Sequence, residues 1–333
     1  MRYRVLLKEH IFEPEKFFPQ CHASTLVVLD HKKEEVLASW FGGTHEKHPD
    51  VAIWLSRRKD GQWSHPVKVA DAEGMPCWNP VLFKAGDDEL HLFYKVGKKP
   101  RVWHTMVMTS NDGGYTWSQP RELVKGDTGG RGPVKNKPIV LWDGTWLAPA
   151  SIETETRWDC FVDISKDGGK TWVRSQMVPI DHGKLKDKGI IQPTLWESEP
   201  GKVHMLTRSS EGFIYRSDSE DGGITWCEAY PTDLPNNNSG IDLVKLENGV
   251  LVLAYNPVQG NWAKRTPIAL SLSEDNGLTW RDEFILDHDE SPGTAHEGEF
   301  SYPAIVAAGN DVYITYTWKR KTIAFWKIRI HSD

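Results

Sequence analysis

Basic, polar and aromatic side chains recur at similar positions along this chain, and together they could bind a negatively charged group. They lie within or just after strand-like segments, and the candidate ligand contacts among them are Asn79, Lys95, Lys137, Gln192, Arg208, Asn237, Asp242, Trp318 and Arg320. An arginine guanidinium binds a carboxylate through two parallel N–H bonds, and a lysine adds a compact positive charge. If the fold brings these positions to one face, they form a cationic site in a chain whose net charge is −6.

A short motif with turn-forming chemistry repeats along the chain and determines the fold prediction. It has the form S-x-D-x-G-x-T-W, and its aspartates are Asp112, Asp167, Asp221 and Asp275, spaced 55, 54 and 54 residues apart. An Asp carboxylate accepts hydrogen bonds from backbone amides a few residues later, and the glycines permit positive φ. We therefore interpret these aspartates as structural turn residues, with the following Thr and Trp starting a strand. A degenerate fifth copy covers residues 56–63.

A second series of segments recurs in phase with the motif. These short runs are mainly apolar or alternate apolar with polar residues, as strands do, and cover residues 36–40, 90–95, 145–151, 203–209, 250–256 and 312–318. A period near 54 divides the 333 residues into about six units. We predict an all-β fold, a six-bladed β-propeller formed by residues 1–333 as a single domain. The N-terminal strand, residues 1–7, should close the ring beside the C-terminal segment, residues 312–330.

Composition limits the partners and the compartment. The 40 basic and 46 acidic residues give no signature of nucleic-acid or anionic-membrane binding. The first residues lack an apolar run of signal-peptide length, and the four cysteines have no C-x-x-C spacing, so we expect a cytoplasmic protein with free thiols. His45, Glu46, His48 and Asp50 are close in sequence but lack the H-E-x-x-H pattern. We expect no metal and no cofactor.

The repeated motif resembles the Asp box, or BNR repeat, of sialidases, and nearly the whole chain is similar to the bacterial group called predicted neuraminidases. The resemblance implies three arginines that hold the carboxylate of the substrate. Arg208, in Leu206-Thr207-Arg208-Ser209, matches the second, and Arg265, ahead of the last motif, matches the third. The first is absent, and His22 stands at its place.

The resemblance also implies catalytic residues. Tyr302 matches the nucleophilic tyrosine, and Glu46 or Asp50 stands where the acid/base aspartate is expected. Gln192 occupies the position of the glutamate that activates the tyrosine. Because an amide cannot accept the phenol proton, another base such as Glu299, Glu297 or His22 would be required.

Three functions follow as alternatives. The first is a sialidase-like, exo-acting glycoside hydrolase that removes a terminal acidic sugar of the sialic or uronic acid type. The second is a lyase that eliminates across a uronate, with His22 or Tyr302 removing the α-proton. The third is a propeller that binds an acidic saccharide without catalysis. The sequence favours the hydrolase, mainly because of the overall resemblance.

Overall fold

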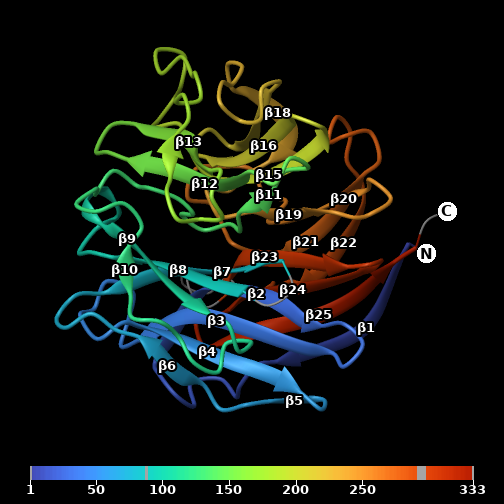
Figure 1. Cartoon of the computed structure of the whole chain (residues 1–333). Helices are drawn as coiled ribbons and strands as arrows, with labels where there is room; N and C mark the ends of the chain where they lie inside the picture. Colours follow the sequence, from blue (N-terminus) through green and yellow to red (C-terminus); the bar gives the residue numbers. More distant parts are fainter. Residues whose placement is uncertain (1, 87–88, 291–297, 332–333) are drawn as a thin grey trace.

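The computed structural model describes residues 2–86, 89–290 and 298–331, and it forms a six-bladed β-propeller (Figure 1). Each blade is an antiparallel sheet of four or five strands. The described residues contain one three-residue 3-10 helix, η1 (Pro100–Val102), and no helix long and apolar enough to cross a bilayer. The predicted all-β propeller is confirmed.

The blades follow one another along the chain. Blade 1 contains β2 (Gln20–Asp30), β3 (Glu35–Gly43), β4 (Ala52–Lys59), β5 (Gln62–Trp63) and β6 (Val67–Ala70). Blade 2 contains β7 (Cys77–Ala85), β8 (Glu89–Val96), β9 (His104–Ser110) and β10 (Arg121–Glu122). Blade 3 contains β11 (Ile139–Val140), β12 (Trp146–Glu153), β13 (Trp158–Ser165) and β14 (Val173–Arg174).

Blades 4 to 6 repeat the same meander. Blade 4 contains β15 (Ile190–Glu199), β16 (Lys202–Ser209), β17 (Phe213–Ser219) and β18 (Tyr230–Pro235). Blade 5 contains β19 (Asp242–Lys245), β20 (Leu251–Tyr255), β21 (Ile268–Ser273) and β22 (Arg281–Asp287). Blade 6 contains β23 (Phe300–Ala308), β24 (Asp311–Trp318), β25 (Thr322–Ile330) and, as its outermost strand, β1 (Tyr3–His10).

The two ends of the chain close the ring, as predicted. Strand β1 pairs antiparallel with β25, from Tyr3 opposite Ile330 to His10 opposite Ala324. The first strands of neighbouring blades pack against one another, β2 against both β7 and β23, and β19 against both β15 and β23. The six segments selected from the sequence fall on β3, β8, β12, β16, β20 and β24, the second strand of each blade. The loop after each of these strands therefore opens on the same face of the ring.

The four motif copies form the turn between the third and fourth strands of blades 2 to 5. In the second copy, Asp167 accepts hydrogen bonds from the backbone N–H of Lys170 and Thr171 and from the Thr171 hydroxyl, at 3.1, 2.9 and 2.6 Å. The hydrogen bond from that hydroxyl is the main cause that lowers the pKa of Asp167 to about 2. These bonds confirm the turn interpretation.

The expectation that Thr and Trp start the next strand is wrong. The fourth strand of the blade begins one to four residues after the Trp, because the Asp carboxylate holds the Thr inside the turn. In the degenerate copy the motif is replaced by a tight hairpin at Asp60 and Gly61, which joins β4 to β5 with positive φ at both residues.

Replacing a motif aspartate should affect stability and leave ligand chemistry unchanged. We expect Asp221→Ala to lower the free energy of unfolding by about 1 kcal/mol, because the bonds to Ile224, Thr225 and Ser219 are lost. Urea denaturation measures the change. Asp233→Ala removes an exposed aspartate that makes no side-chain hydrogen bond to a described residue, and it serves as the control. Equal unfolding midpoints for the two variants would contradict a structural role for Asp221.

Candidate active site

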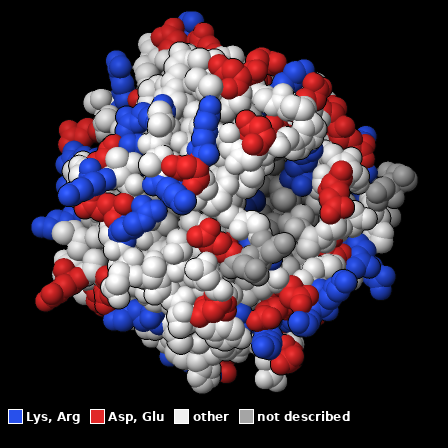
Figure 2. Space-filling view, viewed as in Figure 1, with Lys and Arg blue, Asp and Glu red and all other residues white. Residues whose placement is uncertain are grey.

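A cavity of about 460 Å³ lies on the face where the second-strand loops open. Its lining includes the cations Lys47, Lys98, Lys99, Arg101, Lys188, Arg208, Arg265 and Arg320, against the carboxylates Glu46, Glu153 and Glu155. Its volume falls within the range of about 300–1,000 Å³ that is usual for small-molecule sites. Figure 2 shows acidic and basic groups mixed over one face of the molecule and a hollow in which Lys and Arg side chains lie. An acidic protein thus has a cationic cavity.

Bulges in the first strands of four blades place side chains at this cavity. The pairing register shifts at Ala23 in β2, Asn79 in β7, Gln192 in β15 and Tyr302 in β23, and each of these residues has φ between 40° and 55°. Proline follows three of them, at positions 80, 193 and 303, and cannot donate to the ladder. A bulge redirects a side chain and stores strain, and both occur often at functional sites.

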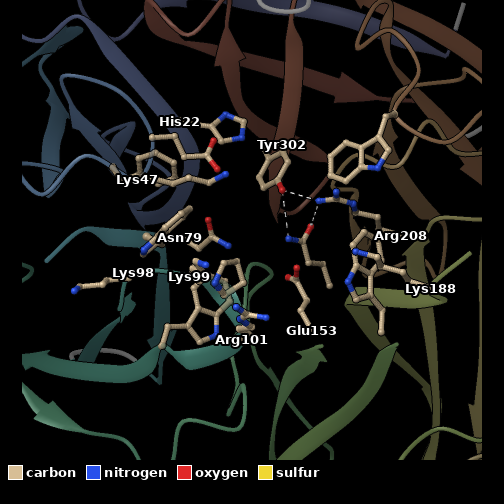
Figure 3. A pocket seen from close by; sticks show the side chains of 18 of the residues that line it. His22, Lys47, Asn79, Lys98, Lys99, Arg101, Glu153, Lys188, Arg208 and Tyr302 are labelled. Atoms are coloured by element: carbon tan, nitrogen blue, oxygen red, sulfur yellow. Dashed lines mark hydrogen bonds between the residues drawn. The ribbon is translucent and has the colours of Figure 1, made fainter. Parts of the chain in front are cut away.

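Arg208, Tyr302 and Gln192 form a hydrogen-bonded triangle in the cavity (Figure 3). The Arg208 Nη1 atom donates to the Tyr302 hydroxyl at 2.6 Å and to Gln192 Oε1 at 3.2 Å, and Gln192 Nε2 lies 3.4 Å from the same hydroxyl. Arg208 Nε donates to Asn238 Oδ1 at 2.7 Å. Two residues of blade 4 therefore contact the phenol of blade 6, and Asn238, in the loop leading into blade 5, holds one of them, Arg208.

Two further arginines enter the cavity and share one buried carboxylate. Arg265 Nη1 donates to Glu299 Oε1 at 2.7 Å, and Arg320 Nε donates to Glu299 Oε2 at 2.9 Å. Arg320 Nη1 also donates to Glu46 Oε2 at 2.6 Å. Because both Glu299 oxygens accept from guanidinium groups, this carboxylate positions arginines and is a poor candidate for the base that Tyr302 would need. Glu297 lies outside the described residues.

His22 lies beside Tyr302, with the two ring centroids 4.2 Å apart, and its Nδ1 is 2.7 Å from the Thr317 hydroxyl. Burial lowers the pKa of His22 well below its ordinary value, and the positive charge of Arg320 acts in the same direction. The imidazole is therefore neutral at physiological pH and a weak base. Beside Arg265, Arg320 adds a further guanidinium near the position of His22.

Glu153 is a cavity carboxyl that the sequence analysis missed. It ends β12 and points toward the Arg208–Tyr302–Gln192 triangle (Figure 3), and its carboxyl group makes no hydrogen bond or ion pair with a described residue. Burial raises its pKa, although the charges of Arg208 and Lys188 oppose the shift. A carboxyl that keeps its proton at higher pH than usual is suited to donate it. Glu153 could have been selected from the sequence by its position, because it lies at the end of a second strand, as Arg208 does in β16.

Two tryptophans flank Arg208 and were not selected from the sequence as site residues. The guanidinium carbon lies 5.7 Å from the ring centroid of Trp158 and 5.5 Å from that of Trp262. The Trp262 side chain lines the cavity mouth, is 63% exposed and has a φ of 56°. A large exposed indole in a strained conformation is available to stack on a sugar.

The structure brings together eight of the fourteen predicted site residues. The cavity lining includes His22, Glu46, Asn79, Gln192, Arg208, Arg265, Tyr302 and Arg320. It does not include Asp50, Lys95, Lys137, Asn237, Asp242 and Trp318. The predicted contact of these six with a ligand is not supported.

Internal bonds explain why the basic residues and Asp242 among these six lie outside the cavity. Buried Lys95 donates to the Thr105 hydroxyl at 2.6 Å and to the Arg131 carbonyl, and burial lowers its pKa to about 7. Lys137 lies 3.0 Å from each Asp242 oxygen, and the backbone N–H of Ile305 donates to the same carboxylate.

The remaining three also serve the fold. Asp50 accepts from the N–H and hydroxyl of Thr44, Asn237 donates to the Lys264 carbonyl, and Trp318 packs beside His10. Asn238, the neighbour of Asn237, is the residue that contacts Arg208. Among the described residues no three His, Cys, Asp or Glu side chains gather as a metal site.

Comparisons with known proteins agree with the fold. The family described as BNR repeat-like domain matches residues 34–314. A sialidase from Clostridium perfringens is 29% identical over 142 aligned residues, and the match covers 37% of this chain and 34% of that protein. The chain thus spans about a third of the length of this relative.

Solved structures share the propeller at low sequence identity. A protein of unknown function from Dyadobacter fermentans has a TM-score of 0.77 and 17% identity, with 99% of this chain and 100% of that chain covered. The NanB sialidase K499G mutant from Streptococcus pneumoniae has a TM-score of 0.71, 13% identity, and coverage of 99% and 70%. Trypanosoma rangeli sialidase with 2,3-difluorosialic acid as a covalent intermediate has a TM-score of 0.70, 15% identity, and coverage of 97% and 59%.

At these identities the solved structures support the fold alone, whereas the family match covers most of the chain. Together with the repeated turn motif and the closed ring of six blades, the family match identifies this chain as a member of the BNR repeat-like family.

Proposed function

We propose that this protein is a glycoside hydrolase that removes a terminal acidic sugar, of the sialic or uronic acid type, from a larger saccharide. The sugar carboxylate would bind Arg208 and the neighbouring guanidinium groups. The sugar ring would lie over Tyr302, and the leaving group would extend toward the cavity mouth.

The observation that carries this proposal is that the buried Arg208 guanidinium lacks a carboxylate partner among the described residues. The Arg208 side chain is buried, and it makes no ion pair with a described residue; its hydrogen-bond partners there are Asn238, Gln192 and Tyr302, all neutral. A buried cation without a carboxylate partner is unfavourable in a folded protein. A ligand carboxylate in the cavity would complete the site, since its two oxygens fit the fork of the guanidinium.

The same geometry supports a division of roles during hydrolysis. Glu153 would protonate the oxygen of the leaving group as the glycosidic bond breaks. Water would then add its hydroxyl to the anomeric carbon and give its remaining proton to the Glu153 carboxylate, which restores the acid. Tyr302 would stabilise the positive charge that develops at that carbon, while Gln192 orients the phenol. A nucleophilic role for Tyr302 would require a base for the phenol proton, and Gln192 and Glu299 are not suited to accept it. Glu46 is a weaker candidate for the acid, because one of its oxygens is occupied by Arg320.

The lowered pKa of His22 disfavours the lyase alternative in which His22 is the base. Elimination requires a base that removes the proton next to the uronate carboxylate. The lowered pKa of His22 makes the imidazole a weak base at neutral pH.

A substrate assay tests the proposal. The purified protein is incubated with a fluorogenic α-sialoside, a fluorogenic β-glucuronide and a neutral β-galactoside. We expect release from an acidic glycoside and none from the neutral one. An unsaturated product from an oligouronate, detected by its ultraviolet absorbance, would instead support a lyase. Binding of acidic sugars without turnover would support a sugar-binding propeller.

A further inference from the structure

The cavity has more positive charge than one sugar carboxylate requires. Arg208 and Arg265 lie beside Tyr302 at one end of it, and Arg320 shares Glu299 with Arg265 there. Lys47, Lys98 and Lys99 lie across the cavity from Arg208, as Figure 3 shows. We call these three residues the lysine rim.

The lysine rim comes from two adjacent loops. Lys47 belongs to the loop between β3 and β4 of blade 1, and Lys98 and Lys99 belong to the loop between β8 and η1 of blade 2. All three side chains are exposed, and none makes a hydrogen bond or an ion pair with another residue in the part of the chain that the structure describes. Three unpaired ammonium groups around one opening attract a second anion.

The backbone beneath these lysines is held in place. The indole N–H of Trp78 donates to the Gly97 carbonyl at 2.7 Å, and the Val102 N–H donates to the Lys99 carbonyl at 3.1 Å. A side chain at Gly97 would collide with the Cα and Cβ atoms of Trp103, so this loop packs closely on the Trp103 backbone. Lys47 has a φ of 77°, a strained conformation for a residue with a side chain. The positions of the lysines are therefore fixed, while their ammonium groups remain free.

We infer that the lysine rim is a second anion-binding subsite, and that the preferred substrate is an oligosaccharide with at least two acidic groups. The first carboxylate binds at Arg208, as in the proposed function on which this inference rests. The second group, a carboxylate or a sulfate on the same or the next sugar, binds at Lys47, Lys98 and Lys99. In a protein with a net charge of −6, this arrangement selects multiply charged saccharides over singly charged ones.

Titration calorimetry with two matched ligand pairs tests the inference. The first pair is sialyllactose and disialyllactose, of which the second carries an additional carboxylate. The other pair is an unsulfated and a monosulfated chondroitin disaccharide, of which the second carries an additional sulfate. For at least one pair we expect wild-type protein to bind the doubly charged ligand about tenfold more tightly, equivalent to about 1.4 kcal/mol. The preference should weaken as salt concentration rises.

The double variant Lys98→Ala/Lys99→Ala should lose this preference and keep its affinity for the singly charged ligand. The control is Lys32→Ala/Lys33→Ala, an adjacent exposed pair on the β2–β3 hairpin, at the end of the blade away from the cavity. No preference for the second charge in either pair, or a preference that survives in Lys98→Ala/Lys99→Ala, would overturn the inference. Failure of the wild-type protein to bind any singly charged ligand would instead contradict the proposed function.

Discussion

Arg208→Ala is expected to lower kcat/KM for an acidic glycoside by roughly 30-fold or more. Removing one partner of a buried, hydrogen-bonded charge pair typically costs about 2–5 kcal/mol, and each 1.4 kcal/mol is a factor of about ten. Here the partner is the sugar carboxylate, because Arg208 makes no ion pair with a described residue. Arg208→Lys should fall between the wild type and Arg208→Ala, since an ammonium keeps the charge and loses the two-pronged geometry.

Arg281→Ala is the matched control for this loss. Arg281 lies on the outermost strand of blade 5 and pairs with Glu274 at the protein surface. Steady-state kinetics and thermal unfolding should be measured on both variants. We expect the melting temperature of Arg208→Ala to change little, because the hydrogen bonds that are lost are offset by removal of a buried cation. Equal losses of kcat/KM in both variants would contradict the proposed binding of the sugar carboxylate by Arg208.

Glu153→Gln is expected to lower kcat by about 10²–10⁴-fold, the usual contribution of a general acid. The loss should be largest for glycosides with poor leaving groups and small for activated aryl glycosides, which need little protonation. The raised pKa of Glu153 also predicts a pH profile. A general acid works while protonated, so wild-type activity should persist above the ordinary glutamate pKa of 4.5 and decline as Glu153 ionises.

Two measurements separate this role from a structural one. Glu155→Gln changes an exposed carboxylate of the same loop, paired with Arg101, and should leave the pH profile unchanged. A carboxyl whose pKa is raised by folding loses stabilising effect as pH rises, so Glu153→Gln should become relatively more stable than wild type toward neutral pH. Full activity in Glu153→Gln with loss of activity in Glu46→Gln would assign the acid to Glu46.

The architecture could be predicted from the sequence because its signal is local and repeated. Each motif aspartate carboxylate accepts from the residue four positions later, and in three copies also from the residue three positions later, so the turn can be recognised within eight residues. The period then counts the blades, and the second strands follow from turn signals next to apolar runs. Ring closure by β1 and β25 followed from the incomplete repeats at the two ends of the chain.

The site could be predicted only in part, because it depends on which end of a blade a residue occupies and on what its side chain meets there. Lys95 and Lys137 have the right type and phase, yet each is bonded inside the fold. Glu153 carries no local motif, and its environment arises from blades far apart in sequence. The bulges at Asn79, Gln192 and Tyr302 could have been predicted, because a proline follows each of these residues in the sequence.

The most direct test of the account is a crystal structure of the protein with a bound acidic monosaccharide, using sialic acid and glucuronic acid in parallel. We predict that the sugar carboxylate lies within hydrogen-bonding distance of the Arg208 guanidinium, with the ring over Tyr302 and an oxygen facing Glu153. A sugar bound elsewhere on the propeller, or bound in this cavity with its carboxylate directed away from Arg208, would contradict the central claim.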